Sequence, residues 1–180
     1  MPMDKLPANL SEYGAVISDD NKYRYSLMRQ ISLFGNHPVV FIMLNPSTAD
    51  ETEDDPTIRR CIGYARHWRA TKMIVVNLFA LRSTSPKSLW AKDTVDPVGP
   101  LNDGAIRWSL EYARMNSGIV VAAWGSNGEY MDRGDTIRGW GWPLKCLKVC
   151  KNGEPAHPLY LSGGLNPIDL ADYAGSRGHD

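Results

Sequence analysis

The sequence has few cysteines, no net charge and no long apolar run, and each shortage excludes a class of protein. Its three cysteines, Cys61, Cys146 and Cys150, are odd in number and lack the spacing of a secreted disulfide framework. The 20 Lys and Arg residues balance the 20 Asp and Glu residues, so no overall basic field attracts polyanions. Any nucleic-acid binding must therefore come from a local basic patch.

Length and apolar content indicate an ordinary globular protein. No apolar stretch reaches the roughly 18 to 20 residues of a membrane span, and residues 1–10 do not have the pattern of a signal peptide. A chain of 180 residues suits one hydrophobic core, so we expect a single domain over 1–180 with a loosely held tail over 162–180. We expect it to be cytoplasmic and without membrane contact, while its oligomeric state stays open.

Continuous apolar runs bounded by turn residues predict strands buried on both faces. Three such runs cover 38–44, 72–81 and 118–124, and 144–150 is a fourth candidate. Upstream, residues 14–34 contain β-branched and aromatic residues around a turn-like segment, which favours an N-terminal hairpin.

Two helices are expected between these strands. The first begins with Asp55 as N-cap and Pro56 as first helical residue, and continues to about Arg69. The second begins at Leu101 and has a predicted buried stripe made of Ala105, Trp108, Tyr112 and Met115. Strands that alternate with helices predict an α/β fold, a three-layer sandwich with a mainly parallel central sheet.

Polar residues follow the apolar runs at the positions where such a sheet binds ligands. The segments 45–48, 77–82 and 124–128 each come at or after the carboxyl end of a predicted strand. In open α/β sheets, ligands bind in the crevice outside these ends. We therefore expect the working site to combine these loops with 157–160.

Four motifs in this order, MLNPSTADETEDDPTIRRC, VVNLFALRSTSP, AAWG and HPLYL, resemble an uncharacterised family named domain of unknown function 1643. More distantly, their order is similar to that of the uracil-DNA glycosylase superfamily. That resemblance implies a uracil-DNA-glycosylase-like fold, with Asn45 positioning the attacking water, Asn77 reading a flipped base and His157 stabilising the departing base. Several of those relatives have Asp where this chain has Asn45, and many have Ser where it has Leu159.

Some relatives also carry an iron–sulfur cluster on four cysteines. With three cysteines and no paired spacing, this chain is expected to hold no such cluster and no other cofactor. The acidic segment 50–55 invites a Mg²⁺ hypothesis, but carboxylates that cap a helix are the simpler interpretation. We therefore expect no metal site.

Asn45 and His157 are the candidate catalytic residues. An amide at position 45 can orient water, although Asn-Pro also begins turns. His157 can donate to a developing anion in either charge state, although a lone His is more often structural.

Substrate-binding candidates surround them. Asn77 can accept from and donate to a base edge, and Phe79 and Trp124 offer flat faces for stacking, although aromatic residues near strand ends are often core. The remaining candidates are Ser47, Thr48, Arg82 and Tyr160 for substrate, and Arg59 and Arg66 for phosphate. A capped turn and a solvated helix face are the structural alternatives for the serine–threonine pair and the two helical arginines.

These residues favour a protein that processes nucleic-acid bases, with a base-binding pocket and attack of water at the glycosidic carbon. Its partner is a nucleic acid or nucleotide. The alternatives are a non-catalytic nucleotide- or base-binding module, group transfer to a modified base, and an adaptor in which the polar loops are structural.

Overall fold

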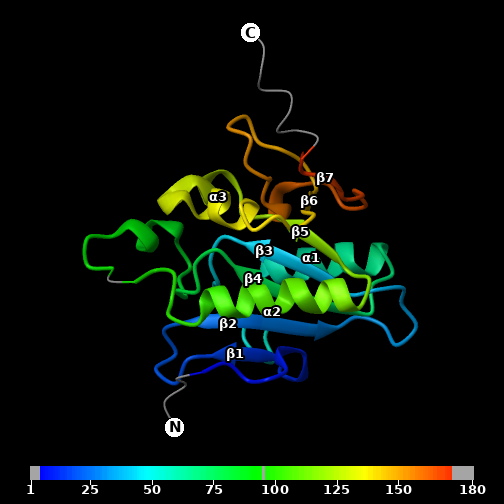
Figure 1. Ribbon diagram of the computed structural model, residues 1–180, viewed down its shortest axis with the longest axis horizontal. Coiled ribbons are helices and arrows are strands. Elements are labelled where there is room, and N and C mark those ends of the chain that lie inside the picture. Colours follow the sequence, from blue (N-terminus) through cyan, green and yellow to red (C-terminus); the bar gives the residue numbers. More distant parts are fainter. Residues whose placement is uncertain (1–4, 95, 172–180) are drawn as a thin grey trace.

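The computed structural model describes residues 5–94 and 96–171, and these form a mixed α/β fold around one sheet (Figure 1). The strands are β1 (Ala15–Ile17), β2 (Arg24–Gln30), β3 (Val39–Met43), β4 (Lys72–Asn77), β5 (Ile119–Ala122), β6 (Lys145–Cys146) and β7 (Ile168–Asp169). They lie in the order β1-β2-β4-β3-β5-β6-β7. The four central strands are parallel, whereas β1–β2, β2–β4 and β6–β7 are antiparallel. The expected α/β class with a parallel sheet centre is confirmed.

The two longer helices cover opposite faces of this sheet. Helix α1 (Pro56–His67) joins β3 to β4, and α2 (Asn102–Met115) joins β4 to β5 on the other side of β3. Right-handed crossovers in opposite directions place their helices on opposite faces. Accordingly, Val40 and Ile42 of β3 pack in the α2 core, whereas Phe41 packs in the α1 core.

The helical segments after β5 are short. Helix α3 (Arg133–Arg138) follows the 3-10 segment Ser126–Asp132, and another 3-10 turn covers Pro158–Tyr160. The remaining 3-10 segments are Leu10–Glu12 and Pro86–Trp90. None of the helices within 5–94 and 96–171 is long and apolar enough to cross a membrane.

Two predicted strands extend further than the observed ones. The apolar run 72–81 forms a continuous strand only as far as Asn77, although Leu78, Phe79 and Ala80 remain buried and Leu81 makes a single bridge with Tyr23. The run 144–150 pairs only at 145–146. In both runs apolar residues follow the strand because neighbouring loops cover them. These side chains stay wholly or partly buried although the continuous strand has ended.

The start of α1 is as predicted. The Asp55 side chain accepts a hydrogen bond from the Ile58 N–H at 2.8 Å, and Pro56 is the first helical residue. The cap satisfies one of the free N–H groups of the first turn.

The predicted stripe of α2 is observed only in part: Ala105 is fully buried, whereas Trp108, Tyr112 and Met115 are not. Met115 is 73% exposed, and the side chains that enter the core are those of Ile106, Leu110 and Ala113. Trp108 stacks on Tyr112 with ring centroids 5.1 Å apart, and both rings lie at the edge of the core. Aromatic rings of this size cover the core from its rim, so the buried stripe is rotated from the one expected.

Residues 162–171, the described part of the expected loose tail, contact the α1 layer. Tyr64 donates its hydroxyl hydrogen to the Ser162 carbonyl at 2.6 Å, and the Trp68 indole N–H donates to the Leu165 carbonyl at 2.9 Å. Strand β7 then pairs with β6. Residues 172–180 lie outside the described part of the chain.

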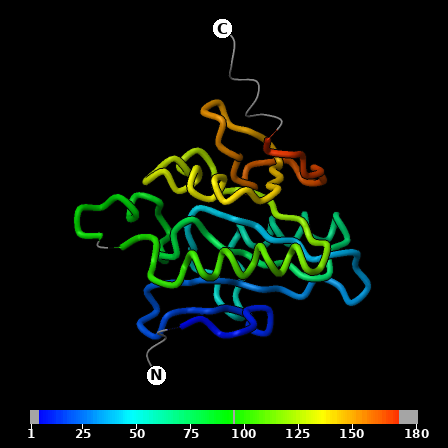
Figure 2. Tube along the Cα trace, in the orientation of Figure 1, coloured from blue at the N-terminus to red at the C-terminus, as the bar shows by residue number. Residues whose placement is uncertain are grey.

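The loops at the two ends of the sheet lie far apart. Figure 2 shows the segment 31–38 at one end and the long segments 78–94 and 96–100 at the opposite end. The latter follow β4, so they lie at the carboxyl ends of the parallel strands, where ligands are expected in this class of fold.

The rotated stripe gives a direct test. We expect Leu110→Ala to lower the free energy of unfolding by about 2–5 kcal/mol, because it leaves a cavity against β3 and β4. Met115→Ala, on the exposed side of the same helix, should change it by less than about 0.5 kcal/mol. Urea denaturation of both variants measures the difference, and equal losses would contradict the observed orientation of α2.

Candidate functional site

A cleft of about 540 Å³ opens at the carboxyl ends of the central strands, on the α1 side of the sheet. The chain leaves β3 toward β4 and leaves β5 toward β6, so the two loops diverge and leave a crevice between them. Segments after β3, β4 and β5, the start of α1 and the chain around His157 all line it. The cleft therefore collects parts of the chain that are widely separated in sequence.

The cleft brings together many of the residues singled out in the sequence. Six of them line it: Asn45, Ser47, Asn77, Trp124, His157 and Tyr160. Five do not: Thr48, Arg59, Arg66, Phe79 and Arg82. The three residues expected to act directly on a ligand, at positions 45, 77 and 157, thus share one cavity.

Asn77 ends β4 and is the most unusual of these residues. It is 1% exposed, and neither its side-chain nitrogen nor its side-chain oxygen has a hydrogen-bond partner in the described part of the chain. A buried amide without partners costs about 1–3 kcal/mol for each unsatisfied group. A donor and an acceptor, both buried and without partners, therefore lie side by side in a residue that lines the cleft.

The backbone of Asn77 is held from the α2 side. Asn102 donates its two amide hydrogens to the carbonyl oxygens of Asn77 and Leu78, at 2.9 and 3.0 Å. Arg133 donates from Nε to the Leu78 carbonyl at 3.1 Å and is itself paired with Asp103 at 2.6 Å. These contacts fix where β4 stops and thereby the direction of the Asn77 side chain.

Asn45 has its amide hydrogens engaged and its oxygen open. Its Nδ2 donates to the carbonyl oxygens of Pro46 at 3.2 Å and Ser83 at 3.0 Å. The side-chain oxygen has no partner among the described residues, so it is available as an acceptor. Asn45 can therefore orient a water molecule but has no base strength with which to deprotonate it.

His157 precedes a 3-10 turn and is held by it. Its Nδ1 accepts the Leu159 N–H at 3.3 Å, so the neutral ring carries its hydrogen on Nε2. Burial lowers the pKa of His157 below its ordinary value, and the Asp55 carboxylate partly opposes this shift. Tyr160, 86% exposed, lies with its ring centroid 6.2 Å from that of His157. The site thus offers a neutral imidazole donor beside an exposed aromatic ring.

Trp124 contributes to the wall of the cleft through a polar network. Its indole N–H donates to Glu154 at 2.5 Å, and Arg138 forms two hydrogen bonds with the same carboxylate at 3.1 and 3.0 Å. The Arg138 guanidinium also lies 5.4 Å from the Trp124 ring centroid. The network joins α3 to the segment before His157, so Trp124 has the structural function that the sequence left open as the alternative to stacking.

Phe79 lies away from the cleft. It is fully buried in the α2 core and packs against Tyr130, with ring centroids 5.5 Å apart. Its ring therefore does not offer the stacking face expected from the sequence.

The expected basic patch lies outside the cleft. Arg59 and Arg66 are on the exposed side of α1, and Arg59 donates to the Asp54 carbonyl. Arg82 donates to the Asn21 carbonyl at 3.4 Å, and Thr48 is exposed. A phosphate bound by these side chains would not lie in the cavity that holds Asn77.

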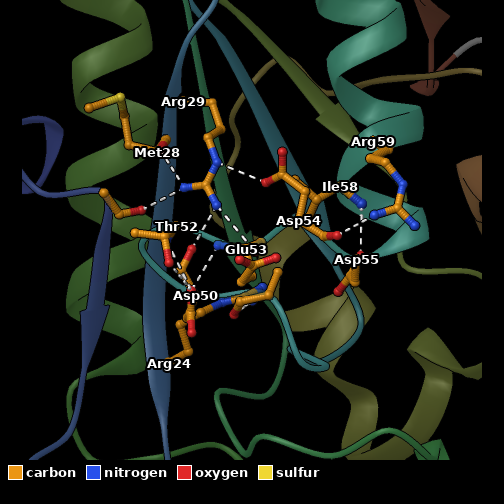
Figure 3. Close-up of polar contacts among 12 residues, drawn as sticks. Arg24, Met28, Arg29, Asp50, Thr52, Glu53, Asp54, Asp55, Ile58 and Arg59 are labelled. Carbon is orange, nitrogen blue, oxygen red and sulfur yellow. Dashed lines mark hydrogen bonds and ion pairs between the residues drawn. The ribbon is translucent and has the colours of Figure 1, made fainter.

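The acidic loop before α1 is occupied by internal contacts (Figure 3). Arg29 of β2 pairs with Asp54 at 2.9 Å and donates to four backbone carbonyls. Asp50 accepts from the backbone N–H groups of Thr52 and Glu53, both at 2.9 Å. Over 5–94 and 96–171, no three His, Cys, Asp or Glu side chains are grouped so as to hold a metal ion.

Two charged residues in the cleft were missed from the sequence. Asp55, expected only as a helix cap, is 8% exposed and lines the cleft. Arg24 of β2 is 2% exposed and also lines it. A helix-cap pattern could have placed Asp55 near the carboxyl end of β3, whereas nothing in the pattern around Arg24 indicated burial.

Comparisons with known proteins give one family and no described activity. The model of the family described as "Protein of unknown function (DUF1643)" matches residues 24–159. No curated protein and no solved structure matched the chain. The matched range includes every cleft residue discussed above except Tyr160.

The lowered pKa of His157 predicts how stability depends on pH. As the pH falls through about 6.5, the unfolded chain binds a proton on this imidazole while the folded chain resists it, so folding is disfavoured. We therefore expect the wild type to lose more free energy of unfolding than His157→Asn between about pH 7.5 and pH 5.5. Asn keeps an acceptor for the Leu159 N–H and removes the titration.

Urea denaturation at several pH values measures this difference, because all other groups titrate alike in the two proteins. A constant gap between wild type and variant over the whole range would show that His157 is not desolvated in the folded state.

Proposed function

Given that the chain belongs to the DUF1643 family, whose description assigns no activity, we propose that it binds a nucleobase in the cleft and acts on its glycosidic bond. In this proposal the fold is of the uracil-DNA glycosylase type, and the ligand is a nucleotide or a nucleotide turned out of a nucleic acid. The order of the loops around the cleft and the three residues Asn45, Asn77 and His157 support the resemblance.

The open amide of Asn77 carries the proposal. A base edge presents neighbouring acceptors and donors, and a carboxamide can pair with both at once. Such an edge would satisfy the two polar atoms that Asn77 leaves without partners. The cost of those atoms in the free protein would then be recovered when ligand binds.

The chemical step would be attack of water on the sugar carbon that carries the base. The Asn45 oxygen would accept a hydrogen bond from that water and direct its lone pair at the carbon. The C–O bond forms, the C–N bond breaks, and the base leaves with the bonding electron pair. His157 would donate from Nε2 to the negative charge developing on the base, while the proton of the water passes to solvent.

A module that binds a base without chemistry is the second candidate. One observation favours it: Asn45 uses both amide hydrogens on backbone carbonyls and cannot act as a base. In that case the cleft would recognise its ligand through Asn77, and His157 would be a further donor.

Two variants separate recognition from chemistry. Asn77→Ala should weaken ligand binding by about 1–3 kcal/mol, because polar groups of the base lose their partners. His157→Asn should slow turnover roughly 10²-fold or more and change binding little, because it removes a donor that acts on the departing base. Equilibrium titration and single-turnover kinetics on base-containing oligonucleotides and nucleotides measure the two effects.

Asn77→Asp is the matched control, because it has nearly the same volume and replaces the amide donor with an acceptor. Loss of binding in Asn77→Asp as well as Asn77→Ala supports recognition by the amide. Unchanged binding in both variants would remove the base-binding site. Binding without turnover by the wild type on every such substrate would favour the module over the enzyme.

A further inference from the structure

Arg24 is a buried cation in the cleft without a carboxylate partner. Its side chain donates from Nη1 to the Ala49 carbonyl at 2.6 Å, and its Nε has no partner in the described part of the chain. Within that part, no carboxylate oxygen lies within 4.0 Å of it. Burial lowers the pKa of Arg24 to about 10, so the guanidinium still carries its charge at neutral pH.

The buried Arg133 and the partly buried Arg29 have different surroundings, because each has a carboxylate partner. Arg29 pairs with Asp54, and all three of its guanidinium nitrogens donate hydrogen bonds. Arg133 pairs with Asp103 and also donates to a backbone carbonyl. Where this chain buries an arginine for structure, it supplies a carboxylate. Arg24 departs from this pattern and lies in the cleft that holds the open amide of Asn77.

A guanidinium with an open edge has a well-defined complement. Two adjacent oxygens of a phosphate or carboxylate accept two parallel N–H donors, and this pair is stronger than a hydrogen bond between neutral groups. A buried charge that lacks its partner is costly, and an anionic ligand would relieve the cost. The open edge of Arg24 therefore fits the anionic group of a ligand.

The charge of the cleft limits how many anionic groups it accepts. Arg24 is the one Arg or Lys among the described residues that line it, and the carboxylate of Asp55 lies in the same cavity. Polynucleotide binding normally rests on several phosphate contacts from lysines and arginines. Arg59 and Arg66, which could make such contacts, lie outside.

We infer that Arg24 binds the single anionic group, a phosphate monoester or a carboxylate, of a small base-containing ligand. The inference rests on the proposed base-binding function and narrows it: the ligand is a mononucleotide or a carboxylated base, and not a nucleic-acid strand. Asn77 would hold the base and Arg24 the anion.

Isothermal titration calorimetry tests this with matched pairs of probes. The pairs are the common nucleosides with their 5′-monophosphates, and uracil with orotate, so that the two sources of the anion are measured separately. In the wild type, the anionic member of at least one pair should bind roughly 10- to 100-fold more tightly than its uncharged partner. A short single-stranded oligonucleotide should bind more weakly than the best mononucleotide or orotate.

Variants of Arg24 should remove this advantage and spare binding of the uncharged partner. Arg24→Met should abolish the advantage, and Arg24→Lys, which keeps the charge without the fork, should reduce it. The melting temperature of Arg24→Met should stay close to that of the wild type, because removal of an unpaired buried charge offsets the loss of the hydrogen bond to Ala49. Arg29→Met should lower the melting temperature. Arg114→Met, on the exposed face of α2, should change neither the melting temperature nor the advantage of the anionic ligands.

The inference would be overturned if both members of every pair bind with equal affinity. It would also be overturned if the tighter binding of the anionic member persists in Arg24→Lys and in any folded Arg24→Met. Tighter binding of the oligonucleotide would also overturn it. If any of these results is found, the proposed base-binding function still holds, provided that nucleosides bind and that their binding depends on Asn77. Conversely, if ribose 5-phosphate binds as tightly as the nucleotides and Asn77→Ala changes nothing, the base-binding function fails and the anion site at Arg24 remains.

Discussion

The hydrogen bonds from Asn102 to the carbonyls of Asn77, the last residue of β4, and Leu78, the residue after it, hold the chain where the strand ends and the cleft begins. Asn102 lies at the start of α2, so the same residue that opens one crossover helix stops the strand before it. The parallel pairing of β4 with β3 ends at Asn77 opposite Met43. Beyond this point the chain can diverge, and the cavity at the carboxyl ends of the strands is the result.

A second set of contacts fixes the opposite wall from β2. Arg29 donates hydrogen bonds to backbone carbonyls of the acidic loop, and Arg24 donates to the carbonyl of Ala49, which directly precedes that loop. These contacts bring Asp55 to the N-terminus of α1 and to the edge of the cleft at once. One antiparallel strand, β2, therefore shapes a site that otherwise belongs to the parallel part of the sheet.

The sequence pattern predicted the centre of the fold better than its borders. Apolar runs such as 38–44 mark strands buried on both faces, and these strands form where expected. The end of β4 was missed because Leu78 to Ala80 are as apolar as the strand itself. The face of α2 was missed because Trp108 and Tyr112 look like core residues at helical spacing, yet lie at the rim.

For the site, the order of the motifs predicted that Asn45, Asn77 and His157 share one cavity, and all three line the cleft. Arg24 could not be found in this way. An arginine in a strand of mixed polarity normally reaches solvent, and only packing against the loop after β3 shows that this one is enclosed. Burial of a charge is a tertiary property, and local sequence carries little information about it.

The short pairing of β6 has a mechanical consequence for the cleft. Its floor belongs to β3 and β4, which share five paired residues, whereas β6 meets β5 through one pair, Val121 with Lys145. The wall that carries His157 depends on loop contacts, such as the hydrogen bond from the Gly125 N–H to the Pro155 carbonyl at 2.8 Å and the pairing of Glu154 with Arg138. Displacing this wall breaks far fewer backbone hydrogen bonds than displacing the floor, so the cavity is stiff on one side and compliant on the other. A compliant side can adjust to the outline of a ligand while the rigid side keeps its polar groups in place.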